Sequence, residues 1–384
     1  MPAPALAVPE LWDSIIDCLT SSQDYSSTAL VCRSFVSRAQ KNLFREVVIE
    51  KRSPAATTYN YGSHNSSISS TVVATRLSAL LDESPHLLSY IQTLEIAESD
   101  SECYAILARI PWSHLENLIL CSLAGLWDSC FEHIKVLAGI NSLCELNLSR
   151  RADPWSIRQI LPVSQHLTSL RLSQQFWTGS QDPGTAALST SQRPHIERLS
   201  LDECKDVTVF LCQVFDFEGL RSLEVMDSLT PDMPHFLSRY GSTVDHITLS
   251  PLERDRYENT DHWDLGLYFP HLTTIKFLSL PDMSFIRFIA GLPLDNRVSY
   301  IGFSDDASPL MRRKGVSATN AKAFEAIAVA QLPLLKVVEV QITASRYIAW
   351  SPETLENSIR ELFPRLRERQ LVTIRVFYFD FGED

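Results

Sequence analysis

The apolar residues of this chain recur in one short pattern: an apolar residue, two variable residues, an apolar residue, one variable residue and a third apolar residue. Side chains two residues apart lie on the same face of a strand, so each copy predicts a short strand with one buried face. Copies recur every 24 to 37 residues, which predicts a repeated structural unit. The eleven copies begin at Ile91, Leu115, Leu143, Leu167, Ile196, Leu220, Val244, Leu272, Val298, Leu335 and Leu371.

The segments between these strands predict helices. Asp153-Pro154 and Ser351-Pro352 each place an N-cap residue before a proline and a periodic apolar stretch, which is typical of a helix start. Gly241 follows another such stretch and favours a helix end. One short strand cannot bury its own apolar face, so the copies are expected to stack. The sequence therefore predicts an α/β solenoid with parallel strands.

This pattern resembles a leucine-rich repeat from about residue 72 to 381, although the consensus is weak. The family has Asn or Cys three residues after the third apolar position, and only Cys204 after Leu201 matches it clearly. Ser99 and Gln175 stand there in other copies. The resemblance implies strands on a concave face and helices on a convex face.

If the strands line a concave face, their polar side chains are the candidates for binding a protein target. These side chains carry both signs of charge, and complementary charge would supply specificity. The candidates are Glu145, Asn147, Arg171, Arg198, Asp202, Glu224, His246 and Lys276, together with Glu339 and Arg375 nearer the end of the chain.

The first fifty residues predict three short helices. Leu11, Ile15, Ile16 and Leu19 have the spacing of one face of an amphipathic helix, and Pro9 suits its start. A second stretch carries apolar residues from Ala29 to Phe35, and a third continues through Leu43, Phe44 and Val47 to Ile49. Three such helices enclose little core, so we expect either a partner surface or the repeats to cover them.

This stretch resembles an F-box of the kind that precedes divergent leucine-rich repeats in mushroom-forming fungi. The similar segments are Pro9-Glu10-Leu11, Leu30-Val31-Cys32-Arg33-Ser34 and Asn42-Leu43-Phe44-Arg45-Glu46-Val47, and Phe35 stands where the family more often has Trp. The resemblance implies binding to a Skp-type adaptor and, through it, to a cullin scaffold. The residues that it assigns to the adaptor are Pro9, Leu11, Ile15, Ile16, Leu19, Leu30, Val31, Cys32 and Phe35.

Three regions follow from these patterns. Residues 1–50 form the F-box-like helical module, residues 51–70 are a flexible linker rich in Ser and Thr, and residues 71–384 form the solenoid. The helical spacing of Val73, Leu77, Leu80 and Leu81 predicts a helix that caps the open end of the solenoid.

Composition narrows the class of protein. A formal charge of −12 argues against nucleic-acid binding by phosphate neutralisation. The absence of an 18-residue apolar window and of a signal-peptide pattern argues against a membrane and favours the cytoplasm or nucleus. Eight cysteines without a C-x-x-C pair are interpreted as reduced core thiols.

The sequence offers little catalytic chemistry. It contains no phosphate-binding loop, dinucleotide fingerprint, zinc-protease motif or nucleophile elbow, so we expect no catalytic residue, cofactor or metal. The polar run Asp261-His262-Trp263-Asp264 is interpreted as a loop or helix start. Trp177 and Trp263 are candidates for either interface anchors or core residues. Five histidines at or near copy starts are interpreted as structural: His86, His114, His166, His195 and His271.

The resemblances to an F-box and to leucine-rich repeats imply a substrate-receptor subunit of a cullin-type SCF ubiquitin ligase. Its F-box would bind the adaptor, and its repeats would bind an unknown protein target. The alternative is a leucine-rich-repeat scaffold whose N-terminal helices only cap the solenoid.

Overall fold

The structure is a computed structural model of the 384-residue chain. It describes residues 9–19, 21–50, 69–97, 99–121, 127–149, 160, 163–175, 193–204, 207–226, 233–250, 264–306, 314–345 and 351–379. Two compact units divide the chain: the first contains residues 1–168 with 191–194, and the second contains residues 169–190 with 195–384.

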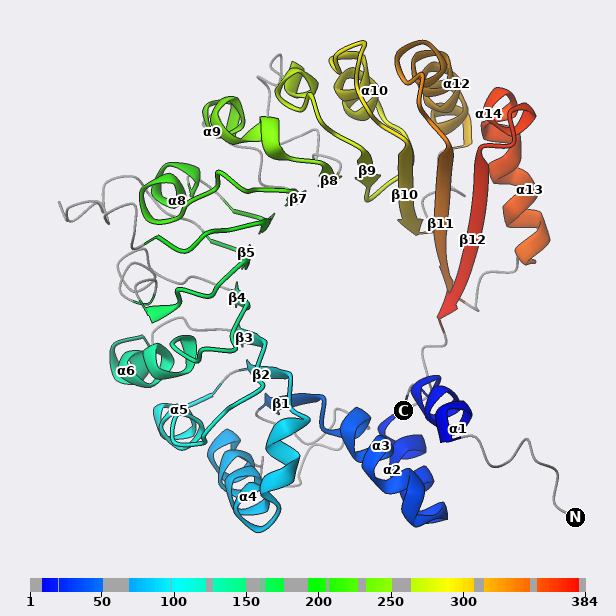
Figure 1. Cartoon of the computed structure of the whole chain (residues 1–384). Helices are drawn as coiled ribbons and strands as arrows, with labels where there is room; N and C mark the ends of the chain where they lie inside the picture. Colours follow the sequence, from blue (N-terminus) through cyan, green and yellow to red (C-terminus); the bar gives the residue numbers. More distant parts are fainter. Residues whose placement is uncertain are drawn as a thin grey trace, which may run out of the picture. The chain divides into compact units, whose positions relative to one another are not determined.

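The first unit begins with helices and continues with alternating helices and strands. In chain order it contains α1 (Pro9–Asp17), α2 (Ser22–Val31), α3 (Arg33–Leu43), β1 (Glu46–Glu50), α4 (Ser70–Glu83), the short helix η2 (Pro85–Ser89), β2 (Thr93–Ala97), α5 (Ser101–Leu107), β3 (Asn117–Cys121), α6 (Trp127–Ala138) and β4 (Glu145–Ser149). Strands β1 to β4 pair in chain order, and every pairing is parallel. Helices α4, α5 and α6 lie on one side of these strands (Figure 1).

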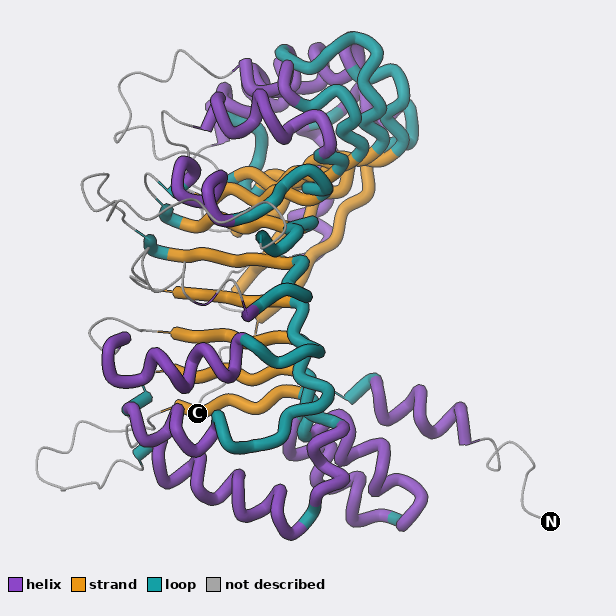
Figure 2. Tube along the Cα trace, turned by 60° about the vertical axis from the view of Figure 1, so that its left-hand side comes forward, coloured by secondary structure: helices purple, strands orange, loops and turns teal. Residues whose placement is uncertain are grey.

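The second unit repeats the same alternation. It contains β5 (Ser169–Ser173), β6 (Arg198–Asp202), α8 (Thr208–Val214), β7 (Ser222–Met226), α9 (Met233–Tyr240), η5 (Gly241–Thr243), β8 (His246–Leu249), η7 (Asp264–Tyr268), β9 (Thr274–Phe277), α10 (Met283–Ala290), β10 (Tyr300–Asp306), α12 (Lys314–Gln331), β11 (Val337–Ser345), α13 (Pro352–Leu362), α14 (Pro364–Glu368) and β12 (Val372–Phe379). Its strands also pair in chain order and in parallel. Figure 2 shows the strands of each unit in orange, lying next to one another in succession.

Each of the eleven predicted copies corresponds to one strand, from β2 to β12. In β2 the burial alternates along the strand, because Leu94 and Ile96 point into the core and their neighbours do not. β3, β4 and β7 show the same alternation. The predicted strand faces are therefore confirmed: one face packs under the helices, and the other, which we call the open face, carries the polar positions.

Toward the end of the second unit the core changes from aliphatic to aromatic. The ring of Phe277 on β9 stacks on Phe303 of β10 with centroids 5.4 Å apart. Phe303 in turn meets Phe324 of α12 at 5.1 Å, edge to face, and Phe363 between α13 and α14 at 6.2 Å. These rings fill the space between sheet and helices where the strands are longest.

At the position three residues after the third apolar residue of a copy, different residue types contact a main-chain carbonyl in the same way. Cys204 is fully buried, and its Sγ lies 3.3 Å from the carbonyl oxygens of Leu172 and Asp202. In other copies the Gln175 amide donates to the Ser173 carbonyl at 3.0 Å, and the Ser99 hydroxyl to the Ala97 carbonyl at 3.3 Å. A buried polar side chain here satisfies a main-chain carbonyl as the strand ends, so the weak consensus still preserves the turn.

The predicted helix starts and ends are confirmed where the structure describes them. Ser351 caps α13 by accepting a 3.2 Å hydrogen bond from the main-chain nitrogen of Thr354, and α9 ends at Tyr240. The start predicted at Asp153-Pro154 lies outside the described residues. So do the candidate anchors Trp177 and Trp263 and the first three residues of the run from Asp261.

Three predictions need correction. Residues 46–50 form strand β1, with Ile49 buried, and not a helical part of the N-terminal module. Pairing with β2 supplies the hydrogen bonds that favour a strand here. The predicted linker is also too long, because Ser69 caps α4 and Ser70 opens it, while residues 51–68 lie outside the described residues. Of the free cysteines, Cys18 and Cys32 are exposed and are not core thiols.

Candidate functional site

The structure offers two candidate interaction surfaces, one on the N-terminal helices and one on the open face of the sheet. The N-terminal helices hold together through a small apolar contact between α1 and α3. Ile16 and Ala39 are 2% and 1% exposed, and the ring of Trp12 lies 5.2 Å from that of Phe35. Phe35 therefore packs against α1, and its aromatic ring contributes to contacts between helices within the N-terminal module.

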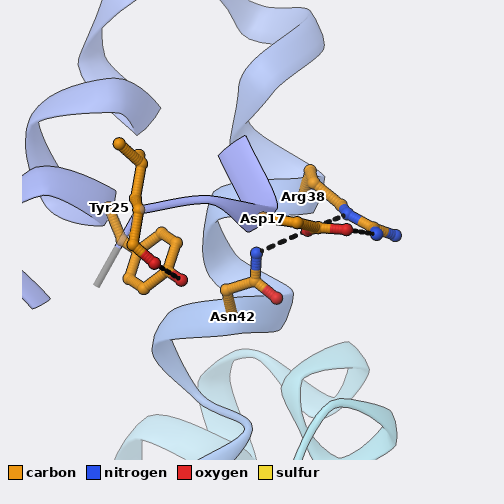
Figure 3. A network of polar contacts seen from close by, with 5 residues as sticks. Asp17, Tyr25, Arg38 and Asn42 are labelled. Carbon is orange, nitrogen blue, oxygen red and sulfur yellow. Dashed lines mark hydrogen bonds and ion pairs between the residues drawn. The ribbon is translucent and has the colours of Figure 1, made fainter. Parts of the chain in front are cut away.

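A polar network fixes the same helices at their surface (Figure 3). The carboxylate of Asp17 at the end of α1 accepts hydrogen bonds from the Arg38 guanidinium and, at 2.9 Å, from the Asn42 amide, both on α3. The hydroxyl of Tyr25 on α2 donates to the carbonyl of Leu19 at 2.5 Å. The hydrogen bonds from Arg38 and Asn42 lower the pKa of Asp17 to about 2, so this carboxylate stays ionised at neutral pH.

The helix α2 is unusual because none of its residues is buried. Leu30 is 88% exposed and Val31 is 71% exposed, while on α1 Leu11 and Ile15 are 50% and 47% exposed. Large aliphatic side chains usually lie inside a folded domain. We refer to Leu11, Ile15, Leu30 and Val31 as the exposed apolar set.

The other residues predicted to contact the adaptor differ in how exposed their side chains are. Ile16 belongs to the core of the module and is not available to a partner. Leu19 and Phe35 are half-buried, Cys32 is exposed with its Sγ 2.9 Å from the Ser34 hydroxyl, and the side chain of Pro9 is not described. Helical spacing could not separate Ile15 from Ile16, because neighbouring residues both fit a broad apolar face.

The second surface is the open face of the second unit, where strand register sets the polar side chains in rows. The central row runs Arg171, Ser200, Glu224, Thr248, Lys276, Gly302 and Glu339 across β5 to β11. Charged residues of alternating sign stand on every second strand, and small residues separate them. Arg171 reaches across Ser200, and its Nη2 lies 3.5 Å from Oε2 of Glu224.

The preceding row is offset by one strand, so that the two rows interleave. It runs Arg198, Ser222, His246, Thr274 and Tyr300 across β6 to β10. Large residues of one row therefore stand beside small residues of the next, which lets long side chains lie across the sheet. The imidazole Nδ1 of His246 in this row is 2.5 Å from the carboxylate of Asp245.

The most enclosed charge on this face is Glu339, whose side chain is 10% exposed. Its carboxylate accepts hydrogen bonds from the Tyr300 hydroxyl at 2.7 Å and the Gln341 amide at 3.0 Å, and it forms an ion pair with Arg375, whose Nε lies 2.9 Å away. These contacts, led by Gln341, lower the pKa of Glu339, and Lys276 adds to the effect. We call Tyr300, Glu339, Gln341, Arg375 and Lys276 the Glu339 cluster.

Two residues of the Glu339 cluster were not among the predicted target-binding positions. Tyr300 is the third residue of the copy that begins at Val298, so the rule that selected the other residues could have found it. Gly302 shapes the cluster as well: a Cβ there would lie 3.2 Å from the Tyr300 ring and 3.4 Å from Cγ of Lys276. Glycine thus leaves room for both side chains close to the main chain of β10. The position of Gln341 follows from the same spacing on β11.

Other predicted target-binding residues are placed as follows. Arg198, His246 and Lys276 are exposed, and Glu145, Asn147, Arg171, Asp202 and Glu224 are half-buried. Glu145 and Asn147 lie on β4 of the first unit, whereas the rows described above belong to strands of the second unit. The Oδ1 atom of Asn147 is buried and accepts no hydrogen bond from the described residues.

The histidines at copy starts are all exposed: His86, His114, His166, His195 and His271. The Nδ1 of His195 lies 3.1 Å from Asp216, and its ring packs so close to Gly219 that a Cβ there would stand 2.2 Å from Nε2. Within the described part of the chain, no three His, Cys, Asp or Glu side chains are grouped to hold a metal ion.

Comparisons with known proteins add no family assignment. No protein-family model matches the chain, and no curated protein sequence matches it. In the ranges that the structure describes, no helix is both long enough and apolar enough to cross a membrane.

Proposed function

We propose that this chain is the substrate-receptor subunit of a cullin-type SCF ubiquitin ligase. In this proposal α1 to α3 act as an F-box that binds a Skp-type adaptor, and the repeats act as a leucine-rich solenoid that binds a target protein through its open face. The chain itself has no catalytic role. It acts by holding the target near a ubiquitin-charged enzyme, which raises the effective concentration of the reacting groups.

The observation that carries the proposal is the exposed apolar set. Burying one large aliphatic side chain contributes roughly 1.5–3 kcal/mol, so four exposed ones on two short helices represent a substantial driving force for association. α2 contacts α3, but none of its own residues is buried. This is expected of a helix whose side away from α3 is covered by another chain. An adaptor with an apolar groove would supply that cover.

A second function is favoured by contacts that tie the helices to the first repeats. The hydroxyl of Ser37 on α3 lies 3.3 Å from that of Tyr90, and Arg45 donates to the Gln92 side chain at 3.0 Å. Strand β1 follows α3 almost directly and pairs with β2. These contacts are those of a cap, so a scaffold without a ligase role is the alternative function. Both functions place the chain in the cytoplasm or nucleus.

Co-purification with a Skp-type adaptor separates the two functions. We expect the parent chain to bind and the double variant Leu30→Asp, Val31→Asp to lose binding, because two charges would enter the apolar contact. Since both residues are exposed, the variant should keep the far-ultraviolet circular dichroism and Tm of the parent. Ser27→Asp, an exposed residue of the same helix, is the matched control and should bind.

Failure of a folded parent chain to retain any adaptor would favour the scaffold. Adaptor binding that survives in the Leu30→Asp, Val31→Asp variant would show that a different surface makes the contact. Ile16→Asp is unsuitable as a test, because a charge at this buried residue would disrupt the module itself.

A further inference from the structure

The Glu339 cluster lies on the open face of strands β9 to β12. Its anion and its cations differ in how far contacts inside the chain already occupy their polar atoms. The carboxylate of Glu339 accepts hydrogen bonds from Tyr300 and Gln341 and forms an ion pair with Arg375, so both of its oxygens have partners. It is also 10% exposed, so little of it can meet a second molecule. A cationic partner therefore finds few acceptors at this place.

The two cations of the cluster, Arg375 and Lys276, are more exposed than Glu339 and keep donors available for a partner. The side chain of Arg375 is 60% exposed, and its Nε lies 2.9 Å from Oε1 of Glu339. A guanidinium carries five donors, so the edge formed by Nη1 and Nη2 keeps its capacity for a bidentate contact. Lys276 is exposed and donates no hydrogen bond to any described residue. Glu339 thus orients Arg375 and attracts Lys276, and both cations keep donors that a partner can reach.

The cluster also has an apolar component. The ring of Tyr300 lies close to Gly302, where a Cβ would stand 3.2 Å from it, and Gly302 is paired with Lys276 on β9 and Glu339 on β11. Phe377 on β12 is 47% exposed and stands two residues beyond Arg375, on the same strand face. Aromatic and arginine side chains in this arrangement are typical of the residues that dominate protein interfaces.

We propose that the Glu339 cluster is the part of the open face that recognises an acidic segment of the target protein. A carboxylate side chain of that segment is received by the Nη1 and Nη2 edge of Arg375, with Lys276 as the second cation, and a neighbouring apolar side chain rests on the Tyr300 ring. This inference deepens the proposed function, since it names the chemistry of the target. It predicts a contact that salt weakens, because both cations are exposed.

The test uses the full chain and a displayed library of random peptides of about twelve residues, long enough to cross several strands. We expect peptides selected by the parent chain to be enriched in Asp and Glu relative to the starting library. The same peptides should bind at least about tenfold more weakly to the double variant Lys276→Gln, Arg375→Gln, which removes both cations without placing a new charge beside Glu339.

The matched control is Arg360→Gln, which removes an exposed cation from α13 on the helical side of the same unit. It should select and bind the same acidic peptides as the parent. Circular dichroism and the Tm of each variant identify loss of binding that comes from unfolding. Ile342→Val in the core of β11 adds a destabilised but intact reference, because its open-face residues are unchanged.

Three outcomes would overturn the inference: no peptide selected above background, selection without enrichment of acidic residues, or equal binding by the parent and the Lys276→Gln, Arg375→Gln variant. Enrichment of basic residues would instead assign recognition to the acidic members of the central row. Adaptor binding is measured separately and depends on α1 and α2, so failure here leaves the proposed function standing. Loss of adaptor binding alone would leave the acidic-segment inference standing.

Discussion

Glu325 accepts a 2.9 Å hydrogen bond from the main-chain nitrogen of Leu366, and both residues are buried. Glu325 lies in α12, whereas Leu366 lies in the first turn of α14. The first main-chain nitrogens of a helix have no partner inside it, so a carboxylate from a neighbouring helix completes this end of α14. One buried side chain thereby joins two consecutive repeats behind the sheet.

The replacement Glu325→Ala should destabilise the chain by about 1–3 kcal/mol, because it leaves a buried main-chain donor without an acceptor. Urea unfolding followed by circular dichroism measures the change. Glu361→Ala, at an exposed residue of α13, is the control and should stay within about 0.5 kcal/mol of the parent. Equal unfolding free energies for the two variants would contradict the capping role of Glu325.

Asp17 predicts an acid-sensitive N-terminal module. Its pKa is lowered from 3.8 to about 2 in the folded chain, so its contacts with Arg38 and Asn42 stabilise the fold above pH 3.8. That stabilisation is lost as the pH falls toward about 2. The side chain is 39% exposed, and solvent screening therefore limits the effect to about 1 kcal/mol or less.

Comparison of Asp17→Asn with the parent tests this prediction. On acidification from about pH 5.5 to about pH 2.5, the parent should lose more unfolding free energy than the variant, since the variant has no carboxylate to protonate at this residue. The prediction is wrong if Asp17→Asn shows the same acid dependence as the parent.

Gly219 should not tolerate a methyl group while His195 keeps its position. A Cβ at residue 219 would lie 2.2 Å from Nε2 and 2.5 Å from Cε1 of the imidazole. The ring would have to rotate away, losing its contact with Asp216 and costing about 0.5–1.5 kcal/mol. Gly219→Ala should lower the Tm accordingly.

Removal of the imidazole should relieve that clash. In a double-mutant cycle, adding His195→Ala to Gly219→Ala should restore stability relative to the sum of the single changes. Additive effects of the two substitutions would mean that the ring does not restrict residue 219.

Tyr300 predicts an alkaline change in stability. Burial raises the pKa of its hydroxyl to about 12, and the hydrogen bond to Glu339 adds to the shift. A pKa raised by folding means that the tyrosine stabilises the fold below pH 10 and that this contribution is lost as the pH rises through about 12. Tyr300→Phe should therefore be less stable than the parent by about 1 kcal/mol at neutral pH.

The difference between the unfolding free energies of the parent and Tyr300→Phe should narrow as the pH rises from about 9 to about 11.5. Above pH 10 the tyrosine ionises in the unfolded parent, whereas folding still requires its protonated form. Urea midpoints at the two pH values give the comparison. A constant difference for Tyr300→Phe would contradict the assigned hydrogen bond.

The strands could be predicted because their information is local. Each copy places apolar residues such as Leu143, Leu146 and Leu148 at fixed spacing, and the hydrophobic effect buries whichever strand face carries them. The same spacing alone predicts that Lys276 and Glu224 lie on the opposite, open face. Strand order follows as well, because repeats stack on their neighbours in the chain.

The strand β1 shows that the repeated pattern extends beyond the eleven predicted copies. Phe44, Val47 and Ile49 have the same apolar spacing, but they follow α3 so closely that the prediction includes them in the helical module. The strand conformation of β1 depends on hydrogen bonds to β2, which lies more than forty residues further along the chain. The spacing marks the face that β1 buries, whereas its pairing with β2 becomes visible only in the structure.

The sequence by itself determined the repeated strands, the face that each strand buries and the presence of helices in the N-terminal module, because these depend on the spacing of apolar residues. Only the tertiary structure decided that Ile16 is buried while Ile15 is exposed, and that Glu339 gathers Tyr300, Gln341 and Arg375 from three strands. Those results depend on which side chains meet across strands and helices. Contacts between residues far apart in the chain are fixed by packing, which no periodicity along one segment encodes.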